Sequence, residues 1–511
     1  MNLKRKMIER DGVFAGSMPG RAIIDIGSNT VRLVIYGGSM RAPSVLLNEK
    51  VTARLGRDIA DKGVLADEAI AIAMRGLERF ALLLTDLEID DVEVVATAAV
   101  RDASNGTQFV AGLRDCGFEA RVLSGEEEAC LSASGVAGAF PGAQGLVADL
   151  GGGSLELVDL DDGVPGEAVS LPLGTLRLPE YRQASRGAMR KRLENALAEG
   201  APAIDTGKTL YLVGGTLRAM AVYAMQEMDH PLSDPHGFAI APDAAKAMLG
   251  KALGTETVES LQARDRISSM RAQKLPDASV LAEAMLARFA PRRIVFSSWG
   301  LREGLLYDRL PDHEKAQDPL LAGISVFATQ RGAPPPLAAR IAGWTVNAVP
   351  PRRHGSERLR LAATMLALAS MQIEPNIRMP QALDWALHKR WIAVSEAERA
   401  MLAAAIAANG NVLDLPRAVT ALASREALEE AVCWGLAVRL ARRLGARSRK
   451  SLQVSGLAIE EDKLVLRLAE SHGALFGLSS EKDMAALAGR LGLRWTCEIV
   501  AGDDLSGARA Q

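Results

Sequence analysis

One short phrase occurs twice in the chain, and it constrains the fold more than any other feature. Residues 25–36 read Asp-Ile-Gly-Ser-Asn-Thr-Val-Arg-Leu-Val-Ile-Tyr, and residues 149–160 read Asp-Leu-Gly-Gly-Gly-Ser-Leu-Glu-Leu-Val-Asp-Leu. Each copy follows a short apolar run and opens another, which predicts a strand, a glycine turn and a second strand. Backbone N–H groups approach anionic oxygens closely where side chains are absent. The repetition therefore indicates phosphate chemistry between two related lobes.

Length and composition predict several domains and no membrane segment. The chain has 511 residues, of which 48% are apolar, and a formal net charge of -2; this length suggests three or four domains. The four cysteines show no metal-ligand spacing and read as reduced, structural thiols. No uncharged run reaches the roughly 18 residues that cross a bilayer, and the first twenty residues lack a secretion signal. We therefore expect a cytoplasmic protein with neither membrane nor nucleic-acid partners.

Strands alternate with helices over the first 300 residues, which is typical of an α/β architecture. The pattern predicts two paired strands within 21–36, a helix over 64–84 that ends near Asp86, a strand at 92–96 and an amphipathic stretch at 107–115. After about residue 312, alanine, leucine and arginine dominate with helical spacing. The last segment, 451–511, contains short alternating runs and is expected to form a small mixed α/β module.

The second copy of the phrase carries the candidate metal ligands. Ser154 and Glu156 share one side of the expected strand, and Asp149 can meet Glu156 across the turn. Two carboxylates beside a phosphate loop suit Mg²⁺, which keeps several waters and bridges to phosphate. The alternative is that Asp149 only caps the turn and Glu156 is a solvated strand residue. In the first copy Arg32 stands at the position of Glu156, so that loop is interpreted as more purely phosphate-binding than the second.

Six motifs carry a resemblance to a known family: Asp25 to Thr30, Ala96 to Arg101, Ser124 to Ala129, Asp149 to Glu156, Val213 to Thr216 and Ser298 to Tyr307. In this order, across residues 21–310, they resemble the Ppx/GppA phosphatase family, and the added helical half resembles its long bacterial exopolyphosphatases. The resemblance implies two ribonuclease-H-like lobes, as in acetate and sugar kinases, heat-shock chaperones and actin, that close on a phosphate chain.

The same resemblance implies hydrolysis of a phosphoanhydride and assigns roles to residues. Glu128, with Glu127 in reserve, would orient or deprotonate the attacking water, although three acids in a first turn after Ser124 are also typical capping charges. Asp149 and Glu156 would hold Mg²⁺. Arg101 would bind the terminal phosphate, unless it only forms a surface ion pair with Asp102. The remaining phosphate donors would come from both turns: Ser28, Asn29, Thr30, Gly152, Gly153 and Ser154.

Other residues in these motifs are expected to be structural. We interpret Arg302 and Glu303 as an ion pair on the helix that returns to the first lobe. His236, beside a proline, is interpreted as a loop residue, and Gly214 and Thr216 either border the substrate or belong to the scaffold.

The expected domains are 1–130 and 131–312 for the two lobes, with a helix at 300–312 rejoining the first, then 313–450 and 451–511. Residues 313–450 resemble a His-Asp phosphohydrolase bundle, but residues 366–372 occupy the place of its metal ligands with neither His nor Asp. His388 alone cannot make a binuclear metal site. The bundle is expected to form a dimer interface or to lengthen a basic groove, with Arg439 to Lys450 as candidates for holding polyphosphate; surface solubility is the alternative.

Three functions remain open at this level. The first is a Mg²⁺-dependent exopolyphosphatase that releases terminal phosphate from inorganic polyphosphate. The second is a phosphatase that removes the 5′ phosphate of guanosine pentaphosphate. The third is a sensor of polyphosphate or alarmone with weak turnover; Glu128 and the paired carboxylates argue against it, since a sensor does not need them.

Overall fold

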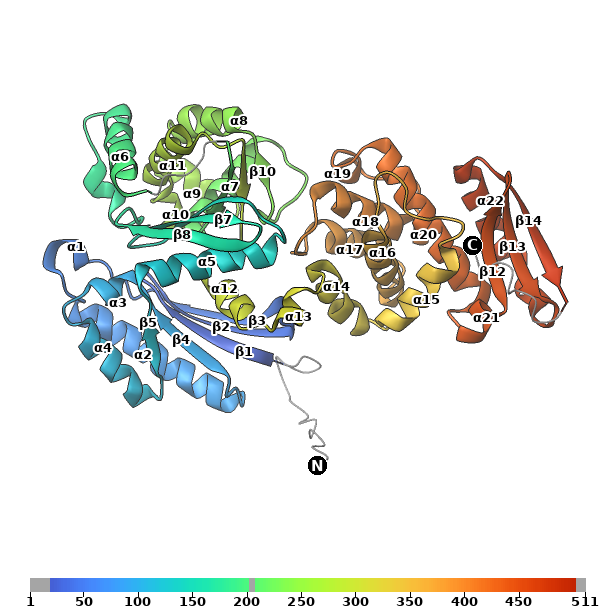
Figure 1. The fold of residues 1–511 in the computed structure, drawn as a ribbon, viewed down its shortest axis with the longest axis horizontal. Coiled ribbons are helices and arrows are strands. Elements are labelled where there is room, and N and C mark those ends of the chain that lie inside the picture. Colours follow the sequence, from blue (N-terminus) through green and yellow to red (C-terminus); the bar gives the residue numbers. More distant parts are fainter. Residues whose placement is uncertain (1–18, 202–206, 502–511) are drawn as a thin grey trace. The chain divides into compact units, whose positions relative to one another are not determined.

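The structure is a computed structural model that describes residues 19–201 and 207–501. The chain divides into two compact units, residues 1–317 and 318–511. Among the helices of the described ranges, none is both long and apolar enough to cross a membrane. Each unit is described by itself below (Figure 1).

The first lobe of the first unit is built on a five-stranded sheet in the order β3-β2-β1-β4-β5. Strands β1 and β2 pair antiparallel, as do β2 and β3, whereas β4 runs parallel to β1 and β5 parallel to β4. Its strands are β1 (Pro19–Ile26), β2 (Val31–Ser39), β3 (Ala42–Val51), β4 (Val92–Ala96) and β5 (Ala120–Val122). The helices of this lobe are α1 (Ile59–Lys62), α2 (Asp67–Asp86), α3 (Ala98–Asp102), α4 (Gly106–Leu113) and the 3₁₀ helix η2 (Arg114–Cys116).

Helix α2 covers one face of this sheet because its apolar residues recur with helical spacing. Ala69, Ala73, Leu77, Phe80 and Leu84 are all buried along one side of it and belong to the same core cluster as apolar residues of β1 and β2. The paired strands, the helix ending at Asp86 and the strand at 92–96 are thus confirmed.

The second lobe repeats the topology. Its sheet has the order β10-β11-β9-β6-β7-β8, in which β8, β7, β6, β9 and β11 correspond to the five strands of the first lobe and β10 adds an antiparallel edge. The strands are β6 (Gly145–Leu150), β7 (Leu155–Asp161), β8 (Val164–Leu171), β9 (Thr209–Val213), β10 (Ala239–Ile240) and β11 (Arg293–Phe296). Both sheets have the strand order of a ribonuclease-H-like lobe, as the family resemblance implied.

Helices surround the second sheet (Figure 1). They are η3 (Leu178–Tyr181), α6 (Arg186–Gly200), α7 (Gly215–Glu227), α8 (Pro242–Ala247), the π-helix η4 (Met248–Leu253), α9 (Val258–Ala263), α10 (Ser269–Ala272) and α11 (Leu275–Phe289). Helix α7 begins directly at the third glycine turn, where Gly214 has a φ of 107°.

Two helices tie the lobes together: α5 (Gly125–Ala139), which follows β5 and packs on β7 and β8, and α12 (Leu301–Asp308), which packs on α5. Leu305 and Leu306 of α12 also enter a buried cluster with Ile23 and Val34 of the first sheet. The two helices approach so closely that a Cβ atom on Gly304 would lie 1.7 Å from the carbonyl oxygen of Leu131. The short helix α13 (Asp312–Lys315) then ends the first unit.

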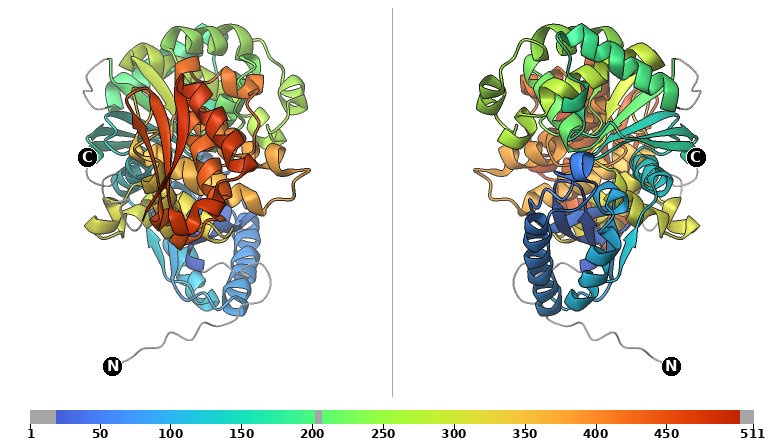
Figure 2. Two further views of the ribbon diagram at one scale, coloured as in Figure 1. Left: turned by 90° about the vertical axis from the view of Figure 1, so that its right-hand side faces the viewer. Right: turned by 90° about the vertical axis from the view of Figure 1, so that its left-hand side faces the viewer.

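The second unit is mainly helical, as predicted, and ends in a small sheet of the order β12-β13-β14. In the left view of Figure 2 the three strands, in red, lie beside α22, which contacts β13 and β14. The elements are α14 (Pro319–Thr329), α15 (Pro335–Thr345), α16 (Glu357–Ala369), η5 (Ser370–Gln372), α17 (Arg378–Leu387), α18 (Glu396–Asn409), α19 (Arg417–Thr420), α20 (Arg425–Gly445), α21 (Arg449–Gln453), β12 (Ser455–Glu460), β13 (Lys463–Ala469), η6 (Glu470–Leu475), α22 (Leu478–Leu491) and β14 (Arg494–Val500).

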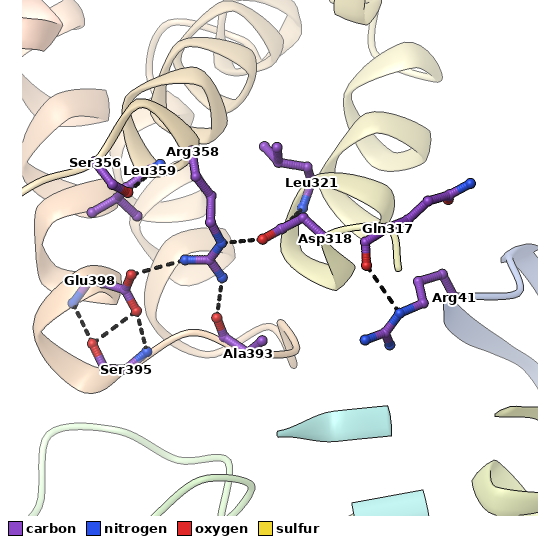
Figure 3. A network of polar contacts seen from close by, with 10 residues as sticks. All are labelled: Arg41, Gln317, Asp318, Leu321, Ser356, Arg358, Leu359, Ala393, Ser395 and Glu398. Atoms are coloured by element: carbon purple, nitrogen blue, oxygen red, sulfur yellow. Dashed lines mark hydrogen bonds and ion pairs between the residues drawn. The ribbon is translucent and has the colours of Figure 1, made fainter. Parts of the chain in front are cut away.

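Arginines hold the helices of this unit together. Arg358 of α16 donates to Asp318 at the start of α14, to the carbonyl of Ala393 and, at 3.0 Å, to Glu398 of α18 (Figure 3). In the basic run, Arg439 and Arg443 both donate to Asp483 Oδ1 at 2.9 Å. These two arginines therefore have a structural role, whatever else the run does.

Candidate functional site

A cleft of about 620 Å³ lies between the two lobes of the first unit, and both glycine turns line it. The turns have the same internal hydrogen bond: the N–H of Gly27 donates to the carbonyl of Thr30, and that of Gly151 to the carbonyl of Ser154, both at 3.0 Å. All six predicted phosphate donors of the turns are cleft-lining residues: Ser28, Asn29, Thr30, Gly152, Gly153 and Ser154. The duplicated phrase thus forms two facing hairpin turns.

The two turns approach each other closely at Gly153. A Cβ atom on this residue would lie 2.9 Å from the hydroxyl oxygen of Ser28 and 3.0 Å from the Cβ atom of Ala98. A side chain at this position would require Ser28 or Ala98 to shift, so glycine suits the close packing of the two turns as well as the approach of an anion.

Asp149 and Glu156 face each other across the second turn, because they are partners in the pairing of β6 with β7. Glu156 is 2% exposed, so the alternative of a solvated strand residue is wrong. Ser132 of α5 donates to Asp149, and Ser170 of β8 donates to Glu156 at 3.0 Å. Burial raises the pKa of both carboxyl groups, and for Glu156 the nearby charges of Glu128 and Asp149 add to the effect.

This donor set fits Mg²⁺. Asp149 and Glu156 would supply two carboxylates to the ion; no group of three or more His, Cys, Asp or Glu side chains suited to a metal occurs in the described part of the chain. Mg²⁺ is commonly held by one or two carboxylates, with waters and substrate phosphates completing its shell. A cation placed between these two neighbouring acids would also remove the electrostatic repulsion between them.

Glu128 lies in the first turn of α5 and lines the cleft, with its side chain 12% exposed. Burial raises its pKa to about 7, although a hydrogen bond from Arg101 Nη1 to Glu128 Oε2 of 3.0 Å opposes the shift. The raised value suits a group that accepts a proton near neutral pH.

Glu127 has a different environment from its neighbour. Its carboxylate accepts from the N–H of Ser124 at 2.8 Å, and its own N–H donates to the Ser124 hydroxyl at 3.1 Å. Ser124 is therefore the N-cap, as predicted, in a reciprocal capping box. The capping role falls to Glu127, and the cleft-facing position falls to Glu128.

Arg101 of α3 lies beside Glu128, but it is not one of the described residues that line the cleft. Besides Glu128 it donates to the carbonyl of Leu123 at 3.1 Å, and it lies 3.4 Å from Asp102. The ion pair with Asp102 therefore exists, but the shorter contact is with Glu128.

One structural expectation is wrong. Arg302 pairs with Asp25 at 3.1 Å, and Glu303 accepts instead from the hydroxyl of Tyr36 at 2.9 Å and from the N–H of Gly300 at 3.1 Å. Adjacent residues of a helix point in different directions, so an Arg302–Glu303 pair within α12 is disfavoured. Arg302 lines the cleft and donates to Asp25, which lies directly before the first turn.

Further residues of the site lay outside the sequence prediction. Ser132, which donates to Asp149, is one helical turn after Glu128 on α5, a spacing that could have revealed it. Lys50, Arg218, Arg271 and Lys274 line the cleft, but no local pattern marks them.

Gly214 and Thr216 border the same cleft. His236 lies in a turn before β10, as expected. It is buried but is not one of the described residues that line the cleft, and its Nδ1 accepts from the N–H of Ser298 at 3.1 Å.

The fold and the cleft define an α/β protein with two actin-like lobes around a glycine-lined, polar site. A family model described as the Ppx/GppA phosphatase family matches residues 34–313, which is more than half of the chain. The chain belongs to the Ppx/GppA phosphatase family and is a hydrolase that acts on phosphoanhydrides.

Similar proteins include exopolyphosphatase 1 of Mycobacterium tuberculosis and of Mycobacterium bovis. Each is 27% identical over 330 residues, which cover 60% of this chain and 93% of the relative. Among solved structures, the Aquifex aeolicus PPX-GPPA enzyme is 26% identical with a TM-score of 0.49, covering 56% of this chain and 98% of its own. An exopolyphosphatase from Cytophaga hutchinsonii is 25% identical with a TM-score of 0.49, covering 56% of this chain and 96% of its own.

Proposed function

We propose that this protein is an exopolyphosphatase that removes the terminal phosphate of inorganic polyphosphate, with Glu128 as the base. The observation that carries the proposal is the position of Glu128, whose buried carboxylate lines the cleft between two glycine turns. The mycobacterial relatives named exopolyphosphatases support the same substrate.

In the proposed reaction Glu128 takes a proton from water, whose oxygen bonds to the terminal phosphorus. The bond from this phosphorus to the bridging oxygen breaks, and the electron pair leaves with the shortened chain. The two turns hold the phosphate oxygens, and Arg101 keeps the carboxylate of Glu128 in place through its 3.0 Å hydrogen bond. Mg²⁺ bound by Asp149 and Glu156 would supply charge neutralisation for the phosphates, which phosphoryl transfer requires.

The character of the cleft supports polyphosphate over guanosine pentaphosphate. Six cationic side chains line it: Arg32, Lys50, Arg218, Arg271, Lys274 and Arg302. Among the described residues that line it, none is a Phe, Tyr, Trp or His on which a base could stack. A polymer of phosphates uses the cations, whereas a guanine ring gains little from this surface.

The test compares phosphate release from long polyphosphate, tripolyphosphate and guanosine pentaphosphate, with Mg²⁺ and with a chelator. The variants are Glu128→Gln and, as a matched control on the same helical turn, Glu127→Gln. We expect Glu128→Gln to lower kcat by about 10²- to 10⁴-fold, the usual contribution of a general base, and Glu127→Gln to keep most of the wild-type kcat.

Each other outcome points elsewhere. Loss of activity in Glu127→Gln alone would move the base to Glu127. Unchanged turnover in both variants would show that neither glutamate acts as the base and would contradict the proposed mechanism. Faster release from guanosine pentaphosphate than from polyphosphate would establish the second function, and tight binding without turnover in the wild type would establish a sensor.

A further inference from the structure

We infer that Arg32 and Lys50 form a subsite for the non-reacting phosphates of the polyphosphate chain, on the wall of the first lobe. The inference rests on the proposed function for its substrate. Both residues line the cleft, yet neither belongs to a glycine turn or to the carboxylate cluster.

Strand pairing places the two side chains in one row. Arg32 of β2 is the partner of Asp25 of β1, and on its other side it is the partner of Lys50 of β3. Partners in neighbouring strands point to the same face of a sheet, and each strand spacing is about 4.8 Å. The row therefore begins at the first turn and leads outward over roughly 10 Å, or two strand spacings.

The one acid in this row, Asp25, is ion-paired with Arg302 and acts on Arg32 only as a nearby charge. In the part of the chain that the structure describes, no carboxylate forms an ion pair with Arg32 or Lys50. Arg32 donates to the amide oxygen of Asn48 at 3.1 Å, and Asp25 is held by Arg302. Like charges directly opposite each other in a sheet are destabilising. An anionic ligand with several charges would compensate this pair.

The positions of Arg32 and Lys50 are poorly explained as ordinary solvent-exposed surface charges. Lys50 is exposed, but Arg32 is only partly exposed, and it lies near the cations Arg302 and Arg271. Glu49, the neighbour of Lys50 in β3, points to the other face, where Arg79 of α2 binds it at 2.9 Å. The sheet thus pairs its charges on the helix-covered face and leaves a cationic pair on the cleft face.

The experiment measures binding of long polyphosphate to full-length Glu128→Gln protein at a series of salt concentrations. Lys50→Ala, Lys50→Arg and Arg32→Gln are introduced into this background. Lys191→Ala is the matched control, because Lys191 is an exposed lysine of α6 outside the cleft, 3.7 Å from Glu194.

We expect Lys50→Ala and Arg32→Gln each to weaken binding about three- to ten-fold. Each should also lower the slope of log Kd against log salt by about 0.7, the value for one lost phosphate contact on a single-stranded polyanion. Lys50→Arg should keep the slope of the parent protein. In the otherwise wild-type enzyme, Lys50→Ala should raise the KM for long polyphosphate by a similar factor.

If Lys50→Ala has the same Kd for polyphosphate and the same salt dependence of log Kd as Lys191→Ala, the proposed subsite is wrong. Failure of the proposed function is a separate result, because it would show as absence of phosphate release by the wild-type enzyme. The binding measurement reports on the subsite in either case.

Discussion

At the scale of single residues, Glu128 carries an electrostatic conflict. Removal from water favours its neutral form, the charges of Asp149 and Asp25 act in the same direction, and Arg101 opposes both. The result is a pKa of about 7, far above the usual range of a glutamate. A carboxyl group in this state is suited to proton transfer, but it affects the stability of the fold.

The pH dependence of stability tests this conflict. Between the unfolded-state pKa near 4.5 and the folded-state value of about 7, the folded protein holds a proton on Glu128 that the unfolded chain has lost. Its free energy of unfolding therefore falls as pH rises through this window. Glu128→Gln lacks the effect, so the stability of this variant relative to wild type should increase by about 1–3 kcal/mol from pH 5 to pH 8.

Denaturant unfolding of both proteins in chelator-containing buffer measures this difference, because a bound cation near Glu128 would lower its pKa. Glu127→Gln serves as the control, since its carboxylate is half-exposed. Parallel pH curves for wild type and Glu128→Gln would show that the pKa of Glu128 is ordinary.

At the scale of elements, the sequence predicted what is local. The two turns, the pairing of Asp149 with Glu156 and the N-cap at Ser124 each depend on residues within eight positions of one another. The pair Arg302–Asp25 joins residues 277 positions apart, and Arg101–Glu128 joins two different helices. Such contacts arise from packing between elements, which no periodicity in the chain records.

The packing of α12 on α5 depends on glycine, and this gives a prediction. In Gly304→Ala the new methyl group would start 1.7 Å from the carbonyl oxygen of Leu131, so the two helices must separate. We expect the free energy of unfolding to fall by at least about 1–3 kcal/mol. We also expect a lower kcat, because α5 carries Glu128.

Gly187→Ala is the matched control for this substitution. Gly187 lies in α6, where a Cβ atom would meet nothing within 4 Å. Alanine is the better helix former, so this variant should be neutral or slightly more stable than wild type. Denaturant midpoints compare the two variants, and equal midpoints would mean that α5 and α12 adjust without cost.

At the scale of the whole molecule, the candidate site belongs to one unit. Every residue that lines the cleft lies between Asp25 and Glu303, and the family model matches residues 34–313. The second unit has its own buried helices, such as α18 and α20, and its own sheet. The described residues that line the cleft therefore all belong to the first unit.

This division predicts the calorimetric behaviour of the full chain. Two cores of separate composition should unfold in two transitions, and a ligand stabilises only the folded state that binds it, by about 2.7 kcal/mol at a concentration 100 times its Kd. Tripolyphosphate added to Glu128→Gln, which spares the ligand from turnover, should raise one transition temperature and leave the other unchanged. Gly304→Ala should lower that same transition, because its clash lies in the first unit. A ligand shift in both transitions would mean that the second unit also contributes to phosphate binding.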